Sequence, residues 1–233
     1  MPEEVNRILT DRVSSFLFCP TETAIKNLAD EAFPFVTTNG TKQFIENVGD
    51  VMQDSAELFA TKATKPQNLK MDGEFILATI HRAENTDDTE RLTNILNALV
   101  TLSETTPVVL PLHPRTRKII ANLNLSTKGL TIIDPVGYLE MIWLLKNTAL
   151  VLTDSGGVQK EAYFFGKPCV TMRDQTEWVE LIEVGANTLV GADREKIIAS
   201  VKQNIGRKII DERQLYGGGV AAKRVAQKIK DCL

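Results

Sequence analysis

The chain has 233 residues, of which 43% are hydrophobic and 24% are charged, and this composition is typical of a soluble globular protein. The formal net charge of −3 gives no electrostatic reason to expect a nucleic-acid or membrane partner. No apolar run approaches about 18 residues and no charged-then-apolar leader is recognisable, so the sequence predicts a cytoplasmic protein. Cys19, Cys169 and Cys232 are far apart, which predicts neither a metal site nor a disulfide framework.

The first seventy residues predict helices and only two short strands. The helices are expected at 3–12, 21–30 (with Thr21 as the N-cap) and 51–61, and the strands at 16–19 and 45–48. Two strands cannot form a doubly wound sheet with its own two-sided core. Residues 1–61 are therefore expected to be the remnant of a Rossmann-like domain whose first part is missing, and the polar, aperiodic segment 62–73 is expected to be a linker.

Residues 74–233 predict a Rossmann-like domain, with a last helix that can pack back on the N-terminal part. Short β-branched runs alternate with amphipathic helical patterns, such as Leu92, Ile95, Leu96 and Leu99, which favours βαβ units and a doubly wound parallel sheet. The expected strands are 75–80, 108–112, 130–133, 149–153, 168–172 and a short one near Leu189. Ligands of such sheets bind at the carboxyl ends of the strands.

The segment 153–162, TDSGGVQKEA, carries an apolar strand through two glycines into a helix. Gly156 and Gly157 let a ligand approach the backbone, and the start of the helix favours an anion. Ser155 adds a hydroxyl, and the carboxylate of Glu161 can accept hydrogen bonds from sugar hydroxyls. These features indicate a nucleotide-sugar diphosphate; the alternative is a turn that needs glycine only for tight packing.

Other polar residues also follow predicted strands. His81 to Asn85 follow the first strand of the sheet, His113 to Arg115 the second, and Arg173 and Asp174 the fifth, where they are expected to line the ligand cleft. Because all these strand ends meet at one edge, the coincidence is stronger than any one motif.

Taken together, the motifs resemble one family. They are PEEVNR (2–7), PTET (20–23), VGD (48–50), HRAEN (81–85), TDSGGVQKEA (153–162), MRDQTE (172–177) and YGGG (216–219). In this order and spacing they are similar to the non-hydrolysing UDP-N-acetylglucosamine 2-epimerases. The resemblance implies two Rossmann-like domains of the glycosyltransferase-B type with the active site between them, of which this chain has the C-terminal domain and a truncated N-terminal domain.

The resemblance also implies a reaction and a set of residues. UDP is eliminated from a UDP-sugar, giving a 2-acetamido glycal, and is added back after C2 is reprotonated on the other face, without a redox cofactor or a metal. Ser155, Gly156 and Gly157 are expected to hold the diphosphate, Glu161 the ribose, and His113 the nucleotide or an effector. The expected catalytic residues are Glu3 and His81, and the expected substrate-binding residues are Arg7, Arg82, Glu84, His113, Ser155, Gly156, Gly157, Glu161, Arg173 and Asp174.

The chain departs from the family pattern in two ways. Family carboxylates other than the one matching Glu3 precede the first residue, so activity is expected to need the missing N-terminal part, which a separate half could supply; complete family enzymes commonly form homodimers. Trp178 stands where many members have arginine, near the expected substrate. This keeps UDP-2,3-diacetamido-glucuronate 2-epimerase chemistry open beside the UDP-N-acetylglucosamine reaction. The functions of a non-catalytic UDP-sugar-binding module and of a related glycosyltransferase stay open as well.

Overall fold

The computed structural model describes residues 2–36, 40 and 42–232, without the side chains of Pro2 and Glu3. The chain divides into two compact units: unit 1 contains residues 1–57 and 212–233, and unit 2 contains residues 58–211. The segment 62–73, predicted as a linker, has no helix or strand, but Leu69 within it is buried in the core of unit 2. The C-terminal residues 212–233 belong to unit 1.

Unit 1 is built on a pair of parallel strands. Its elements are α1 (Pro2–Val13), β1 (Phe16–Cys19), α2 (Glu22–Asp30), β2 (Phe44–Asn47), most of α3 (Val51–Ala60) and α11 (Ala221–Cys232). β1 pairs with β2 in parallel, with Phe16 opposite Phe44. Thr21 caps α2 as predicted, since its side chain accepts a hydrogen bond from the backbone N–H of Ala24. A small core of Leu17, Cys19, Leu28 and Phe33 lies beside the strands.

The C-terminal segment is hydrogen-bonded within unit 1 to α3 and to the residue before it. Both carboxylate oxygens of Asp54 accept from the first N–H groups of α11, at Ala221 and Ala222. The N–H of Asp50 donates to the carbonyl of Tyr216 at 2.9 Å. The VGD and YGGG motifs therefore meet, and Tyr216 is fully buried at this meeting point.

Gly49 is required at this contact for two reasons. Its φ is +90°, and a Cβ on it would lie 2.6 Å from the carbonyl oxygen of Tyr216 and 2.9 Å from the Cα of Gly217. We expect Gly49→Ala to destabilise unit 1 by about 3 kcal/mol, the sum of left-handed strain and backbone overlap. Thermal unfolding followed by circular dichroism should show the loss. Gly40→Ala, which shares a positive φ but whose Cβ would meet nothing within 4 Å, should cost only about 1 kcal/mol; equal losses would contradict the role of the contact.

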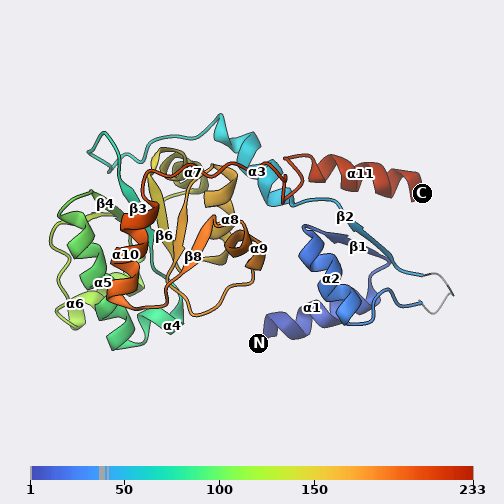
Figure 1. Cartoon of the computed structure of the whole chain (residues 1–233), viewed down its shortest axis with the longest axis horizontal. Coiled ribbons are helices and arrows are strands. Elements are labelled where there is room, and N and C mark those ends of the chain that lie inside the picture. The colour runs from blue at the N-terminus through green and yellow to red at the C-terminus, as the bar shows by residue number, and fades with distance from the viewer. Residues whose placement is uncertain (1, 37–39, 41, 233) are drawn as a thin grey trace. The chain divides into compact units, whose positions relative to one another are not determined.

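Unit 2 contains a six-stranded, entirely parallel sheet (Figure 1). Its strands are β3 (Ile76–Thr79), β4 (Val108–Pro111), β5 (Thr131–Ile133), β6 (Leu150–Thr153), β7 (Cys169–Thr171) and β8 (Asn187–Leu189). Its helices, besides the end of α3, are α4 (Ala83–Thr86), α5 (Thr89–Ser103), α6 (Pro114–Asn122), α7 (Tyr138–Asn147), α8 (Gly156–Phe164), α9 (Val179–Glu183) and α10 (Arg194–Asn204). The strand order β5-β4-β3-β6-β7-β8 is doubly wound, which confirms the predicted Rossmann-like α/β class.

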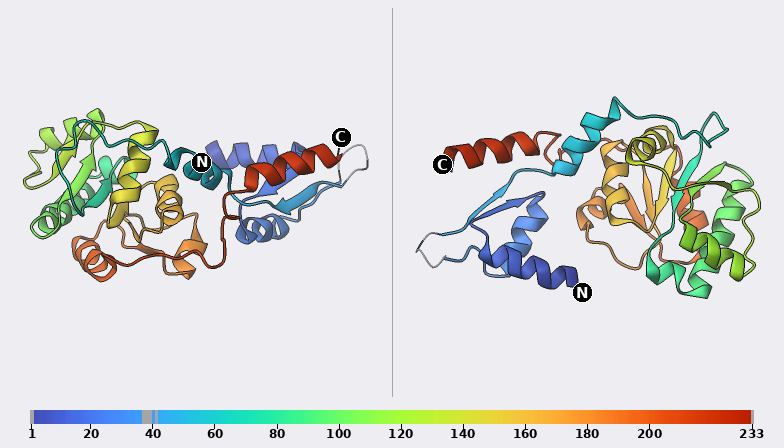
Figure 2. Two further views of the ribbon diagram at one scale, coloured as in Figure 1. Left: turned by 90° about the horizontal axis from the view of Figure 1, so that it is seen from above. Right: turned by 180° about the vertical axis from the view of Figure 1, so that it is seen from behind.

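Alternate side chains of each strand pack against opposite layers of helices. Ile76 and Ala78 of β3 join one core with apolar residues of α5, α6 and α10, whereas Leu77 joins the other with residues of α7 and α8. The two helical layers can be followed from other sides in Figure 2. Because both faces are covered, the central strands β3, β4 and β6 consist mostly of buried apolar residues, as buried parallel strands usually do.

The order of the strands fixes where a ligand can bind. β3 and β6 are neighbours at the centre of the sheet, and the chain winds outward from them in opposite directions. Their last residues pair, and the hydroxyls of Thr79 and Thr153 lie 2.5 Å apart. The crevice outside these two strand ends is the topological switch point, where ligands of open α/β sheets bind.

Candidate functional site

Asp154, directly after β6, organises the switch point. It is fully buried, and its carboxylate accepts hydrogen bonds from the backbone N–H groups of His81 and Arg82 at 3.0 Å, across the end of the neighbouring strand. The Asn85 side chain also donates to it, at 3.3 Å, and to the carbonyl of Met172 at 2.9 Å. Burial alone would raise the pKa of Asp154, but the hydrogen bonds from His81 and Arg82 hold it below its usual range.

His81 is fixed by the same carboxylate. Its Nδ1 lies 3.0 Å from Asp154, while half of the imidazole stays exposed. The hydrogen bond to Asp154 raises the pKa of His81, against the opposing effect of burial. Since an ionised carboxylate only accepts, Nδ1 carries the proton, and Nε2 is the nitrogen left for a ligand.

The start of α8 faces this pair from the other strand. Ser155 is the N-cap, with its hydroxyl accepting from the N–H of Val158 at 3.4 Å, and its own N–H donates to Thr153 Oγ1. Gly156 has an ordinary negative φ, and a Cβ on it would meet no atom closer than 3.5 Å. Packing therefore does not require glycine at 156, because the nearest side-chain atoms are at van der Waals distance from its Cβ position. This position lies at a helix N-terminus, where an anion is favoured.

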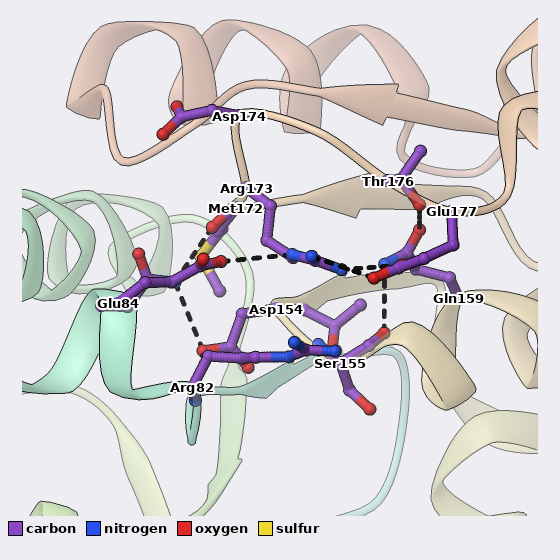
Figure 3. Close-up of polar contacts among 12 residues, drawn as sticks. Arg82, Glu84, Asp154, Ser155, Gln159, Met172, Arg173, Asp174, Thr176 and Glu177 are labelled. Carbon is purple, nitrogen blue, oxygen red and sulfur yellow. Dashed lines mark hydrogen bonds and ion pairs between the residues drawn. The ribbon is translucent and has the colours of Figure 1, made fainter. Parts of the chain in front are cut away.

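A buried arginine, Arg173, holds the carboxylates of Glu84 and Glu177 (Figure 3). The guanidinium of Arg173, only 6% exposed, forms two hydrogen bonds with Glu177, at 2.9 and 3.1 Å, and one with Glu84 at 3.2 Å. The bidentate pair with Glu177 raises the pKa of Arg173. Glu84 and Glu177 are each about half exposed. The arginine is therefore occupied by protein carboxylates, and the carboxylates are the groups that reach solvent.

Glu161 is buried in the second turn of α8. Burial raises its pKa, although a hydrogen bond with Tyr138 and the charge of Lys160 act in the opposite direction. Tyr138 begins α7 and is itself 43% exposed. The Glu161–Tyr138 pair thus connects the buried carboxylate to the surface.

The raised pKa of Glu161 predicts a specific pH dependence. Because the folded state holds its proton above the ordinary value of 4.5, stability should fall as pH rises from that value through the folded pKa. Glu161→Gln removes this loss. Urea unfolding followed by tryptophan fluorescence should show the mutant gaining stability relative to the parent as pH rises above 4.5. The exposed Glu183→Gln serves as the control, and a gain as large there, or none at Glu161, would contradict the argument.

Several predicted site residues meet at the switch point, and others lie elsewhere. His81 and Arg82 both donate to Asp154, the residue before Ser155, and Arg82 also lies near Gly156. Glu84 and Arg173 lie beside Arg82 and Ser155 (Figure 3). Asp174 points away from this group and pairs with Arg91 at 2.9 Å. His113 caps α6 through Nδ1 at the end of β4, and its side chain is exposed.

Arg7 lies in unit 1, and the Glu3 side chain falls outside the described residues. Arg7 is held by Glu4, Asp11 and Glu31 at 2.7 to 2.8 Å and lines a groove of about 850 Å³ between α1, β1 and α2. The hydrogen bonds that Arg7 donates to Glu4 and Glu31 raise its pKa. Its guanidinium is thus engaged with carboxylates of its own unit.

The sequence did not predict four residues of the site individually. Asp154, Asn85 and Glu177 lie inside quoted motifs, and the position of Asp154 immediately after a buried strand was a usable signal. The fourth is Gln159, which also lies inside a quoted motif, at 153–162. Its amide donates to the carbonyl of Ser155 and accepts from Thr176 and Asn187. A glutamine inside an amphipathic helix carries no such signal, because its partners come from distant parts of the chain.

The geometry defines a class of protein before any comparison. A doubly wound parallel sheet has a serine-capped helix start, a glycine in its first turn and a buried carboxylate paired with an imidazole at its switch point. This is a nucleotide-binding arrangement of the Rossmann type. Among the described residues, no cluster of metal-ligand side chains is placed to hold an ion, and no helix has the length and apolarity to cross a bilayer.

Comparison with known proteins identifies the family. The profile of the UDP-N-acetylglucosamine 2-epimerase family matches residues 1–230, so the chain belongs to this family. UDP-2,3-diacetamido-2,3-dideoxy-D-glucuronate 2-epimerase of Pseudomonas aeruginosa is 61% identical over 97% of the chain, and UDP-N-acetylglucosamine 2-epimerase of Methanocaldococcus jannaschii is 41% identical over 97%.

The solved structures agree with this membership. The M. jannaschii enzyme in complex with UDP-GlcNAc and UDP has a TM-score of 0.83 at 40% identity, and the Neisseria meningitidis enzyme bound to UDP-GlcNAc has a TM-score of 0.82 at 30% identity. Each alignment covers 99% of this chain and 65% of the other. The chain spans 63% of the length of the P. aeruginosa relative and 64% of the M. jannaschii one. The predicted membership and glycosyltransferase-B-type fold are confirmed.

Proposed function

We propose that this chain binds the UDP part of a UDP-activated 2-acetamido sugar in unit 2 and takes part in its 2-epimerisation. The observation that carries the proposal is the joining of His81 to the start of α8 through the buried Asp154. Family membership supplies the reaction class, and the geometry supplies groups suited to a diphosphate leaving group.

The diphosphate is proposed to lie at the N-terminus of α8, over Ser155, Gly156 and Gly157. The backbone N–H groups there donate to phosphate oxygens, and the helix dipole favours their charge. Arg82 adds a positive charge, because one of its terminal nitrogens lies 3.7 Å from the Cβ position of Gly156. Glu161 is proposed to accept from the ribose hydroxyls.

His81 is proposed to stabilise the departure of UDP. In the forward step a base removes the C2 proton, the C2–H electrons form the C1=C2 bond, and the C1–O bond to the β-phosphate breaks. A protonated His81, favoured by its raised pKa, donates from Nε2 to the phosphate as charge develops on it. UDP then adds back to C1, and C2 takes a proton on the opposite face. Glu3 remains the proposed base in unit 1.

UDP-2,3-diacetamido-glucuronate is the first candidate substrate. The 61% identity to the P. aeruginosa enzyme exceeds the 46% and 41% to two archaeal relatives named for UDP-N-acetylglucosamine. UDP-N-acetylglucosamine is the second candidate, supported by the family profile over nearly the whole chain. We also propose a homodimer and a separate N-terminal partner, from the family resemblance alone.

The reaction is tested by proton exchange at C2. The 233-residue chain, alone and with the N-terminal part of a family enzyme added as a separate polypeptide, is incubated with each UDP-sugar in D₂O, and the C2 proton is followed by NMR. Reversible elimination replaces that proton by deuterium and yields both epimers, and we expect His81→Asn to slow the exchange by roughly a hundredfold or more, in the range of a lost acid–base group. A chain that binds UDP but exchanges neither sugar, even with the N-terminal part added, would refute its part in epimerisation.

A further inference from the structure

Trp178 is held by the first two turns of α8. Its indole Nε1 donates to the carbonyl oxygen of Gly156 at 2.9 Å. The ammonium of Lys160, a residue only 5% exposed, lies 4.1 Å from the centroid of the ring, a distance typical of a cation–π contact. One side chain therefore joins the loop after β7 to the helix that starts at the expected diphosphate.

The loop has a second attachment to the same turn. The N–H of Trp178 donates to Thr176 Oγ1 at 3.2 Å, and that hydroxyl donates to Gln159 Oε1 at 2.7 Å. Gln159 in turn donates to the carbonyl of Ser155 at 3.2 Å. Residues 176–178 thus reach the carbonyls of both Ser155 and Gly156.

This attachment determines which side-chain atoms surround the Cβ position of Gly156. The three atoms nearest to a Cβ there would be Trp178 Nε1 at 3.5 Å, Glu177 Oε2 at 3.6 Å and Arg82 Nη2 at 3.7 Å. Glu177 is the chain neighbour of Trp178 and the bidentate partner of Arg173. A displaced indole would therefore also move the Glu177 carboxylate and the Arg173 guanidinium that is bonded to it.

We propose that Trp178 is a positioning residue for a nucleoside diphosphate: its indole N–H and its Lys160-supported ring hold the loop 172–178 at a fixed distance from Gly156. This inference rests on the proposed function, because the ligand is the UDP expected at α8. It also assigns a role to the tryptophan that departs from the family's arginine. The indole N–H lies at the edge of the anion site and sets the distance between residues 176–178 and the start of α8.

The chain carries its own probe for this proposal, since it has only two tryptophans. Trp143 lies in α7, stacked on Phe75 ahead of β3, at the opposite end of the sheet from the switch point. Trp143→Phe leaves Trp178 as the single indole. Titrating this variant with UDP should change its emission saturably, with the Kd that calorimetry gives for the parent chain.

Trp178→Phe keeps a ring over Lys160 but loses the indole N–H. It should bind UDP roughly threefold to tenfold more weakly, the effect of one hydrogen bond, and UDP should cause no change in its emission.

A measurement without ligand separates this proposal from the proposed function. In Trp178→Phe, amides of residues 172–178 should exchange with D₂O faster than in the parent, while circular dichroism remains unchanged. Amide exchange rates equal to those of the parent would overturn the positioning role. So would an unchanged UDP affinity of Trp178→Phe together with no UDP-induced change in Trp178 emission in Trp143→Phe. A parent chain that binds no UDP, yet shows the faster exchange on mutation, would overturn the proposed function and the ligand role while leaving the attachment of the loop established.

Discussion

Asp154→Asn should destabilise unit 2 by about 2 to 3 kcal/mol. The asparagine cannot carry the charge that accepts from the backbone N–H groups of His81 and Arg82, and its own NH₂ group would face some of these donors. Charge-assisted hydrogen bonds of a fully buried carboxylate have this magnitude. Urea unfolding followed by tryptophan fluorescence reports on unit 2, because Trp143 and Trp178 both belong to it.

The matched control is Asp174→Asn. Asp174 is exposed and forms one surface ion pair, with Arg91, so its loss should cost at most about 0.5 kcal/mol. Similar losses at the two positions would contradict the organising role of Asp154.

The substitution Asp154→Asn should also lower the pKa of His81, which NMR can measure. Asp154, whose pKa is lowered, stabilises the fold above its ordinary value of 3.8 and loses that contribution as pH falls through the folded pKa. His81, whose pKa is raised, contributes fully below 6.5 and loses its contribution as pH rises through the folded pKa. The penalty of Asp154→Asn should therefore be largest between these two ordinary values. A penalty that is flat with pH would mean that the pair carries no charge coupling.

Gly156→Ala should reduce UDP affinity by at least about tenfold and leave stability within about 1 kcal/mol of the parent. The protein tolerates a Cβ there because φ is ordinary and the nearest atoms are at van der Waals distance. A phosphate group seated over the α8 N–H groups does not, because the methyl would occupy its space. Calorimetry and thermal unfolding measure the two effects separately.

Gly137→Ala is the control for Gly156→Ala. Gly137 also has an ordinary φ, −72°, and an uncrowded Cβ position, but it caps α7. It should leave UDP binding unchanged. Unchanged binding in Gly156→Ala as well would place the ligand elsewhere.

The sequence predicted the fold well because the sheet is buried on both faces. Continuous apolar runs such as Ala149 to Leu152 have few alternatives to a buried parallel strand, and all six expected strands lie within two residues of the observed ones. Strand-end reasoning also brought His81, Arg82 and Ser155 together, because parallel strands end at one edge.

The details of the site depended on contacts that no local pattern encodes. Arg173 and Asp174 are adjacent in sequence, yet the first is buried between two carboxylates and the second pairs with Arg91 at the surface. Opposite sides of an extended segment receive different partners, and those partners come from α4, α5 and the loop itself. The bond from Trp178 to Gly156 is of the same kind, since it joins residues 22 positions apart.

Calorimetric titration of the 233-residue chain with UDP tests the central claim most directly. We predict saturable binding with one site per chain, abolished or strongly weakened by Ser155→Ala together with Gly156→Ala and unchanged by Gly137→Ala. A folded chain that takes up no UDP, or one whose binding survives the changes at the start of α8, would contradict the assignment of this helix as the nucleotide site.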